Sequence, residues 1–274
     1  MERFAVLIGI DDQDSDGLPP YCVKDANEIG EVLEDFCGFK KKNIFKILSP
    51  KNKENTSSIA ELENSIDILI KERKLDADDL FFFYFSGHGK FDIGTQHSSL
   101  VFPDGNLQTT KIKDYLDRLH PKAAILLLDA CFIGSKLFSK SANNEKLKRK
   151  FYIDSEVVYG IYASPTSREA YMPPKLTNSL LTHFFIDTIR NKENYDNDGY
   201  LSIEHVAAIC AKKSYKYSID MVSAKQITKE QVIVREGRIE GYIPFAEIAV
   251  GITTSRIVSR NFLSVYSKQQ KILS

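Results

Sequence analysis

The chain alternates short apolar runs with longer stretches in which apolar residues recur every three to four positions. The apolar runs have the length of buried strands and lie at residues 4–10, 43–48, 80–85, 123–129 and 157–163. The helical spacing covers residues 25–36, 57–74, 109–119, 178–190 and 203–213. Continuous apolar strands joined by crossover helices are typical of a parallel sheet that is buried on both faces. The pattern predicts an α/β fold with an open, mostly parallel β-sheet sandwiched between helices.

Two of the predicted strands run directly into turns that carry reactive side chains. The strand at 80–85 leads into Ser-Gly-His-Gly, which places His88 just beyond its end, and the strand at 123–129 leads into Cys131. Ligands of open parallel sheets bind in the crevice beyond the carboxyl ends of the strands. Because one helix and one strand separate the two turns, we expect both turns to open on that edge of the sheet.

This pair of residues has the chemistry of a thiol hydrolase. A cysteine attacks a carbonyl as thiolate, and a neighbouring imidazole can take the thiol proton and later protonate the leaving amine. We therefore predict Cys131 as nucleophile and His88 as base, with the backbone amides of Gly89 and Cys131 as an oxyanion hole. Each residue alone also has a structural interpretation, because buried cysteines are commonly inert and a histidine between glycines can simply occupy a turn. Cys37 and Cys210 lack a histidine on a neighbouring strand end.

The two turns belong to longer motifs, Tyr-Phe-Ser-Gly-His-Gly at 84–89 and Asp-Ala-Cys at 129–131. These motifs resemble the His and Cys motifs of the caspase and metacaspase family. Similar segments lie at 18–26, 100–104, 162–164, 169–171 and 179–182, so the resemblance covers about residues 3–215. Residues 132–134 depart from it, because Phe-Ile-Gly stands where metacaspases usually have His-Ser-Gly. The resemblance implies a caspase-like fold and a thiol protease that acts as a cysteine endopeptidase.

The resemblance also indicates which substrate side chain is recognised. Metacaspases carry acids at the positions of Asp25 and Asp129, and residues 19–22 hold no base where a caspase would supply an arginine. Two carboxylates in a partly desolvated pocket repel each other, and an entering guanidinium or ammonium relieves that repulsion. We therefore predict cleavage after Arg or Lys, and the resemblance adds Ser86 and Cys22 to the pocket wall. Asp25 also has a simpler interpretation, as an acid that stabilises the N-terminus of its helix.

Composition indicates which classes of binding partner to expect. Lys plus Arg and Asp plus Glu both number 37, so the overall field that attracts nucleic acid or an acidic membrane is missing. The N-terminal apolar run is too short for a signal peptide or a membrane span. The four cysteines have no metal-type spacing, which favours a reducing compartment. We expect a cytoplasmic protein that acts on protein or peptide substrates with Arg or Lys at P1 and binds neither nucleic acid nor a membrane.

We expect a single caspase-like peptidase domain over residues 1–274, with the His- and Cys-bearing part at 1–134 and a C-terminal part at 157–274. The segment between them, 135–156, is polar and basic and predicts an exposed loop. An enzyme that cleaves after basic residues could process itself within 140–156, although a solvated charge run explains the same residues. Two alternatives remain open. One is a caspase-fold pseudoenzyme that scaffolds a signalling or defence assembly with a regulatory protein partner, and the other is an active peptidase with a different P1 preference.

No motif requires a metal or an organic cofactor for the chemistry. Residues 194–200 resemble the first half of an EF-hand loop, but its twelfth position holds His205 in place of a bidentate Glu. A polar β-turn explains these acids equally well. Some metacaspases need calcium bound elsewhere, so the resemblance leaves calcium dependence open and assigns no ligand. The first strand leads to acids and not to a glycine-rich phosphate loop, which disfavours a dinucleotide site.

Overall fold

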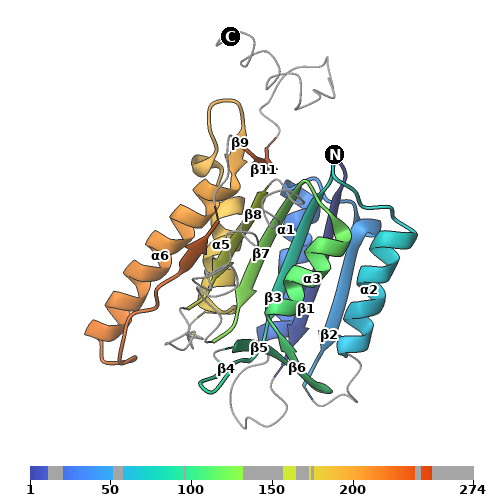
Figure 1. Ribbon diagram of the computed structural model, residues 1–274. Coiled ribbons are helices and arrows are strands. Elements are labelled where there is room, and N and C mark those ends of the chain that lie inside the picture. The colour runs from blue at the N-terminus through green and yellow to red at the C-terminus, as the bar shows by residue number, and fades with distance from the viewer. Residues whose placement is uncertain are drawn as a thin grey trace, which may run out of the picture.

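A sheet of six described strands forms the centre of the structure (Figure 1). This computed structural model describes residues 1–11, 21–51, 58–95, 97–131, 157–164, 173, 176–237 and 242–248. The strands lie in the order β10, β8, β7, β3, β1, β2, and every neighbouring pair is parallel except β10 with β8. Their bounds are β1 (Arg3–Ile10), β2 (Ile44–Ser49), β3 (Leu80–Ser86), β7 (Ala123–Asp129), β8 (Val157–Tyr162) and β10 (Val234–Glu236). The predicted α/β fold with a mainly parallel sheet is confirmed.

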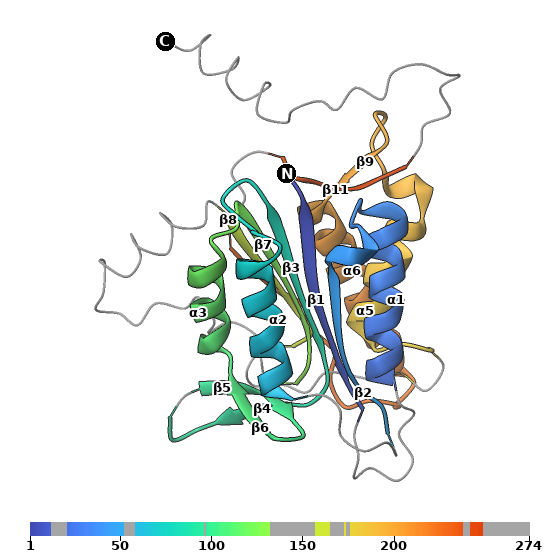
Figure 2. The same cartoon turned by 90° about the vertical axis from the view of Figure 1, so that its right-hand side faces the viewer.

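Helices cover both faces of this sheet (Figure 2). One face carries α1 (Tyr21–Phe36), α5 (Leu180–Arg190) and α6 (Ile203–Ser223), and the other carries α2 (Ile59–Lys71) and α3 (Thr110–Leu119). Strand β3 is buried along its whole length, so its successive side chains enter the two layers in turn. Phe82 and Tyr84 pack in the core beneath α1 and α5, whereas Phe81 and Phe83 pack beneath α2 and α3. Burial on both faces explains why the strands are continuous apolar runs in the sequence.

The first turns of α1 lie very close to β1, and Gly9 permits this approach. A Cβ atom at position 9 would lie 2.4 Å from the Cys22 carbonyl oxygen and 2.9 Å from the Ala26 Cβ. Any other residue would therefore push α1 away from the sheet, so the absence of a side chain is required here. The contact brings the start of α1 to the carboxyl end of β1.

Two smaller sheets lie at opposite ends of the central sheet (Figure 1). The antiparallel strands β4 (Gly89–Asp92), β5 (His97–Phe102) and β6 (Gly105–Gln108) lie at the carboxyl end of β3, and β9 (Tyr200–Ser202) pairs with β11 (Pro244–Glu247) at the other end. The Arg3 guanidinium donates hydrogen bonds to the carbonyl oxygens of Phe245 at 2.7 Å and Pro244 at 3.0 Å. These bonds fasten β11 to the first strand. Two 3-10 turns, η1 (Lys41–Asn43) and η2 (Lys192–Asn194), complete the described elements.

Two helices differ from the sequence prediction. Helix α1 begins at Tyr21 and not at Asp25, so Asp25 lies in the second turn with its side chain buried. The interpretation of Asp25 as a helix N-terminal acid is therefore wrong. Helix α6 continues past residue 213 to Ser223, because Ser218 and Met221 extend its buried face. Among the described helices, none combines the length and the apolar character needed to cross a bilayer.

Candidate active site

The turns that carry His88 and Cys131 follow neighbouring strands at the carboxyl edge of the sheet. Strands β3 and β7 are parallel, and Ser86 at the end of β3 is in register with Asp129 at the end of β7. His88 and Cys131 lie at equal distances along the chain beyond this pair. The Gly87 amide also donates a hydrogen bond to the Asp129 carbonyl oxygen at 3.4 Å. The structure thus brings together the two strand ends that the sequence predicts to meet.

Adjacent strands hold the backbone of both turns. The His88 carbonyl oxygen accepts a hydrogen bond from the Val101 amide of β5 at 3.0 Å. On the other side, the Ala163 amide donates to the Leu128 carbonyl oxygen at 3.0 Å. The His88 residue is exposed, and Cys131 is partly buried. A partly accessible thiol and an accessible imidazole on adjacent, anchored turns suit nucleophilic catalysis.

The Gly89 amide, a predicted oxyanion donor, points away from strand β5. Gly89 opposes Leu100 in the β4–β5 ladder, and the hydrogen bond from Val101 to His88 flanks this pair. In an antiparallel ladder, flanking bonds mark a non-hydrogen-bonded pair, whose N–H groups point away from the partner strand. The Gly89 N–H is therefore directed outside the ladder, on the segment that follows the His88 turn.

The side chains of Asp25 and Asp129 meet in a buried cluster at this edge. Asp25 comes from α1 and is 0% exposed, and Asp129 ends β7 and is 3% exposed. Strand alternation explains the orientation of Asp129, because Ile125 and Leu127 on the same face of β7 pack beneath α1 and α5. The hydroxyl of Ser179, the residue before α5, contacts Asp25 Oδ2 at 2.7 Å and also contacts Asp129 Oδ2. One hydroxyl therefore joins the two predicted pocket acids.

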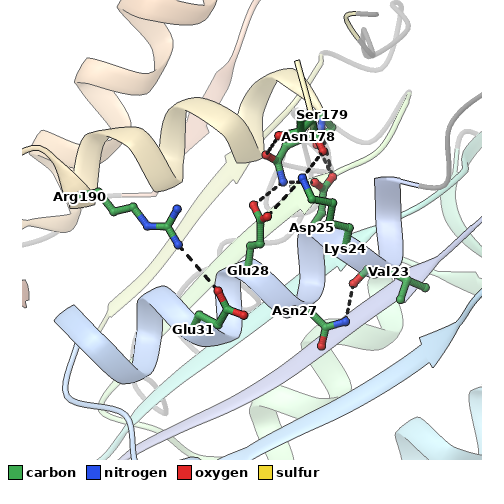
Figure 3. A network of polar contacts seen from close by, with 10 residues as sticks. Val23, Lys24, Asp25, Asn27, Glu28, Glu31, Asn178, Ser179 and Arg190 are labelled. Carbon is green, nitrogen blue, oxygen red and sulfur yellow. Dashed lines mark hydrogen bonds and ion pairs between the residues drawn. The ribbon is translucent and has the colours of Figure 1, made fainter. Parts of the chain in front are cut away.

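Further donors from the start of α5 reach the same carboxyl groups. Figure 3 shows Asn178 and Ser179 facing Asp25 of α1. The Asn178 side-chain amide donates to Asp25 Oδ1 at 2.8 Å, and the Ser179 backbone amide donates to Asp25 Oδ2 at 3.3 Å. Asp129 Oδ2 accepts from the Thr182 amide at 3.0 Å and from the Thr182 hydroxyl at 2.7 Å. The acids are thus held by neutral donors at the start of α5 and from the two residues before it.

Ser86 and Cys22, the other predicted pocket residues, belong to this cluster. The Ser86 hydroxyl donates to Asp25 Oδ2 at 3.3 Å. Cys22 is buried, and burial raises the pKa of its thiol, an effect that a hydrogen bond with Ser86 opposes. The structure therefore brings together all four residues that the sequence assigns to the P1 pocket.

Burial changes the titration of both acids. Burial, and next the negative charge of Asp129, raises the pKa of Asp25 to about 7, although hydrogen bonds from Ser179 and Asn178 oppose the shift. Burial likewise raises the pKa of Asp129, against hydrogen bonds from Ser179 and Thr182. Both carboxyl groups therefore keep a proton to higher pH than an exposed aspartate does.

Sequence reasoning missed the contribution of Asn178, Ser179 and Thr182 to this cluster. Their segment resembles the start of a late helix in the family, but local sequence does not show which helix packs beside α1. The structure itself marks Ser179 as unusual, because this residue occupies the N-cap of α5 but its side chain makes no capping hydrogen bond. Its hydroxyl serves the carboxyl groups instead.

Hydrogen bonds to the Asp196 carboxylate stabilise the acidic turn before β9. Asp196 Oδ1 accepts from the backbone amides of Asp198 at 3.0 Å and Tyr200 at 2.8 Å, and Oδ2 accepts from the Tyr242 hydroxyl at 3.0 Å. Gly199 supplies a positive φ of 82°. These contacts support the interpretation of residues 194–200 as a polar turn.

Comparison with known proteins identifies the family of this chain. A family model described as the caspase domain matches residues 2–232. The chain belongs to the caspase-domain family. This is a family of cysteine peptidases. No curated protein matches the chain significantly.

Solved structures support the fold of this caspase domain. The caspase-1 structure from Spodoptera frugiperda is 13% identical, with a TM-score of 0.57 and coverage of 92% of each chain. A structure titled pro-sf-caspase-1 is 14% identical, with a TM-score of 0.52 and coverage of 89% of this chain and 90% of the other. At such low identity the likeness shows the shared architecture alone.

The four cysteines of this caspase domain differ in accessibility, and we expect alkylation to discriminate between them. Cys22, Cys37 and Cys210 are buried, and burial raises the pKa of the Cys210 thiol to about 12. Cys131 is partly exposed. Because the accessible thiolate is the reactive species, brief iodoacetamide treatment of the folded protein is expected to modify Cys131 roughly tenfold faster than the others. Peptide mass spectrometry measures this ratio, with urea-unfolded protein as control. Equal modification of a second cysteine in the folded protein would contradict it.

Proposed function

We propose that this caspase domain is a cysteine endopeptidase that cleaves peptide bonds after Arg or Lys, using Cys131 and His88. The observation that carries the proposal is the buried pair of Asp25 and Asp129 at the strand end that leads to Cys131. The donors described at this pair are neutral hydroxyl and amide groups. A substrate guanidinium or ammonium supplies the positive charge that two buried carboxylates favour.

In the proposed reaction, the His88 imidazole takes the thiol proton of Cys131, and the thiolate attacks the P1 carbonyl carbon. The amides of Gly89 and Cys131 stabilise the negative charge that develops on the carbonyl oxygen. His88 then gives its proton to the leaving amine, the C–N bond breaks, and the acyl group stays on Sγ. A water molecule that loses a proton to His88 attacks the thioester, and the proton returns to Sγ as the acid leaves.

The recognition of P1 follows from the position of the acids. Asp129 lies at the end of the strand that leads to the nucleophile, so a side chain bound to it belongs to the residue whose carbonyl is attacked. The three donors described for Asp129 all reach its Oδ2 atom, and a cationic ligand can add its contact at Oδ1. The same preference makes the basic segment 140–156 a candidate for self-cleavage. That segment, together with residues 132–139 and 165–172, lies outside the described residues.

Peptide substrates that differ only at P1 test this proposal. Citrulline has the shape of arginine without its charge and is therefore the matched control. Loss of one partner of a buried charged contact costs about 2–5 kcal/mol, so kcat/KM for arginine is expected to exceed that for citrulline roughly 30- to 3,000-fold. Release of a coumarin leaving group, under reducing conditions with and without added calcium, gives these ratios.

Each contrary outcome rejects a different part of the proposal. Preference for Asp over Arg would reject the acidic pocket but keep the peptidase. Absence of turnover on every peptide, with no labelling by a peptidyl-arginine chloromethylketone, would reject the enzyme and favour a scaffold role.

A further inference from the structure

The Ser179 hydroxyl lies between the two buried carboxyl groups, and this arrangement restricts how many protons they hold. Its Oγ atom is within hydrogen-bond distance of Asp25 Oδ2 and Asp129 Oδ2. A hydroxyl carries one hydrogen and two lone pairs, so it can donate to only one of these oxygens. With both acids ionised, the second contact would set two lone pairs against each other in a buried site. A hydrogen bond on both sides requires a proton on one carboxyl group.

We propose that Asp25, Ser179 and Asp129 hold one shared proton in the ligand-free protein, and that a cationic P1 side chain expels this proton to solvent. One carboxylic acid donates to Ser179 Oγ, and Ser179 donates to the other carboxylate. The expulsion rests on the proposed function, whereas the shared proton does not. Ser179 is on this basis a residue that determines how the pocket accepts a charge.

Among the described residues, the nearby basic side chain Lys24 makes its contacts elsewhere and not with the pair. On α1, Lys24 Nζ is bound to the Thr177 carbonyl oxygen at 2.8 Å and to Glu28 Oε1 at 3.2 Å, and not to the pair. Glu28 Oε2 also accepts from Asn178 at 2.8 Å, as Figure 3 shows. The Lys24 charge is thus matched by Glu28.

Within the part of the chain that the structure describes, the other titratable groups around the pair add no positive charge in contact with it. They are Asp11 after β1, Cys22 on α1, Tyr84 on β3, and His183 and Asp187 on α5. Burial lowers the pKa of His183, which favours its neutral form. The hydroxyl groups of Tyr84 and Thr182 are hydrogen-bonded at 2.7 Å. The Thr182 hydroxyl in turn donates to Asp129 Oδ2, so a chain of hydrogen bonds links Tyr84 to Asp129. The raised pKa of both acids agrees with a retained proton.

Binding of a cation favours the pair with both acids ionised over the pair that shares a proton. A guanidinium at the pair stabilises both ionised acids, so the shared proton leaves as the ligand enters. Because the ligand competes with the proton, its affinity is expected to fall as the pH drops below about 7 and to become constant in the alkaline range. The number of protons released per ligand approaches one on the acid side and zero on the alkaline side.

Calorimetry of the inactive Cys131→Ala protein tests the expulsion. A peptide amide with arginine at P1 is titrated, at each pH, in two buffers that hold that pH and whose heats of ionisation differ. At about pH 6 we expect release of roughly one proton per bound peptide, and at about pH 9 none. A citrulline peptide is expected to release none at either pH. Arginine-dependent binding at about pH 6 without proton release would overturn the expulsion and leave the proposed function intact.

The shared proton has a separate test that needs no ligand. Aspartate carboxyl carbons, labelled with ¹³C, are followed by NMR against pH in the ligand-free protein. One titration with a near-neutral midpoint is expected, and either Asp25→Asn or Asp129→Asn should remove it. Ser179→Ala should lower the midpoint, because the hydroxyl can donate to only one carboxylate and its second contact disfavours the doubly ionised pair, and Ser179→Thr should restore it. Titration of both acids in the ordinary acidic range would overturn the shared proton. A near-neutral midpoint without arginine binding would instead reject the proposed function.

Discussion

Replacement of Cys131 by alanine is expected to abolish hydrolysis of arginyl peptides, with kcat/KM lower by on the order of 10⁴-fold or more. The side chain lies on the turn after β7, next to the strand end that carries His88, and the proposed acyl-enzyme cannot form without its sulfur. Residual rates would then come from binding and from the oxyanion donors alone. Stopped assays at high enzyme concentration measure this residual activity.

Further variants show whether the loss of activity is specific to Cys131 and His88. Cys210→Ala removes a buried thiol of α6 that contacts Thr188, and it is expected to leave kcat/KM nearly unchanged. His88→Ala is expected to match the loss of Cys131→Ala, and the double variant to be no worse, because the two residues act as one unit. Cleavage within 140–156 that persists in purified Cys131→Ala protein would show that a different protease is responsible.

Asp25→Asn is expected to damage activity and to stabilise the protein at the same time. The amide keeps the shape of the carboxyl group but cannot carry the charge that a P1 arginine requires. We expect kcat/KM for arginyl peptides to fall roughly 30- to 3,000-fold, mainly through KM. At pH 8 we expect the free energy of unfolding to rise by on the order of 1–3 kcal/mol, because a second buried negative charge is removed.

The sign of the stability change follows from the direction of the pKa shift. The ordinary pKa of an aspartate is 3.8, and burial together with Asp129 raises that of Asp25 to about 7. Between these values the folded protein binds a proton that the unfolded chain does not. The free energy of unfolding therefore falls as the pH rises through this window, and it is lowest once Asp25 is ionised. An asparagine at this position does not titrate, so its contribution stays constant.

Urea unfolding followed by far-UV circular dichroism, at about pH 5 and about pH 8, measures the effect, since the chain contains no tryptophan. Asp67→Asn is the matched control, because hydrogen bonds from Lys71 and Arg118 lower the pKa of Asp67 and no stabilisation is expected there. A loss of stability at pH 8 in Asp25→Asn equal to that at pH 5 would contradict the prediction.

The central sheet could be predicted because its strands are buried on both faces. Strands β3 and β7 each have seven consecutive buried residues, and the run stays hydrophobic until the last position, Ser86 or Asp129, so both strands are easy to recognise in the sequence. The short strands β4 and β6 have four residues each, and only Leu107 among them is buried, which is too little pattern for recognition. The antiparallel β10 has three residues, and its pairing with β8 depends on a contact distant in sequence.

The candidate site was predictable where it follows the strands and unpredictable where it depends on helix packing. His88, Cys131 and Asp129 occupy strand ends, so topology alone places them at one edge. Asp25 required the family resemblance, because a buried acid within a helix looks like an ordinary surface residue in sequence. Ser179 and Asn178 join the cluster only because α5 packs against α1, and no local pattern reports that contact.

In the proposed site, the register of β7 couples the choice of substrate to the cleavage reaction. Asp129 and Cys131 lie on a single short segment of chain, whose backbone accepts hydrogen bonds from the Gly87 amide and the Ser164 hydroxyl. A change that reshapes the pocket from this segment will also shift the nucleophile. The rest of the proposed pocket comes from α1, from Ser86 at the end of β3 and from the start of α5, and none of these carries a reacting group. New cleavage preferences are therefore more readily evolved or engineered from the helices than from the strand.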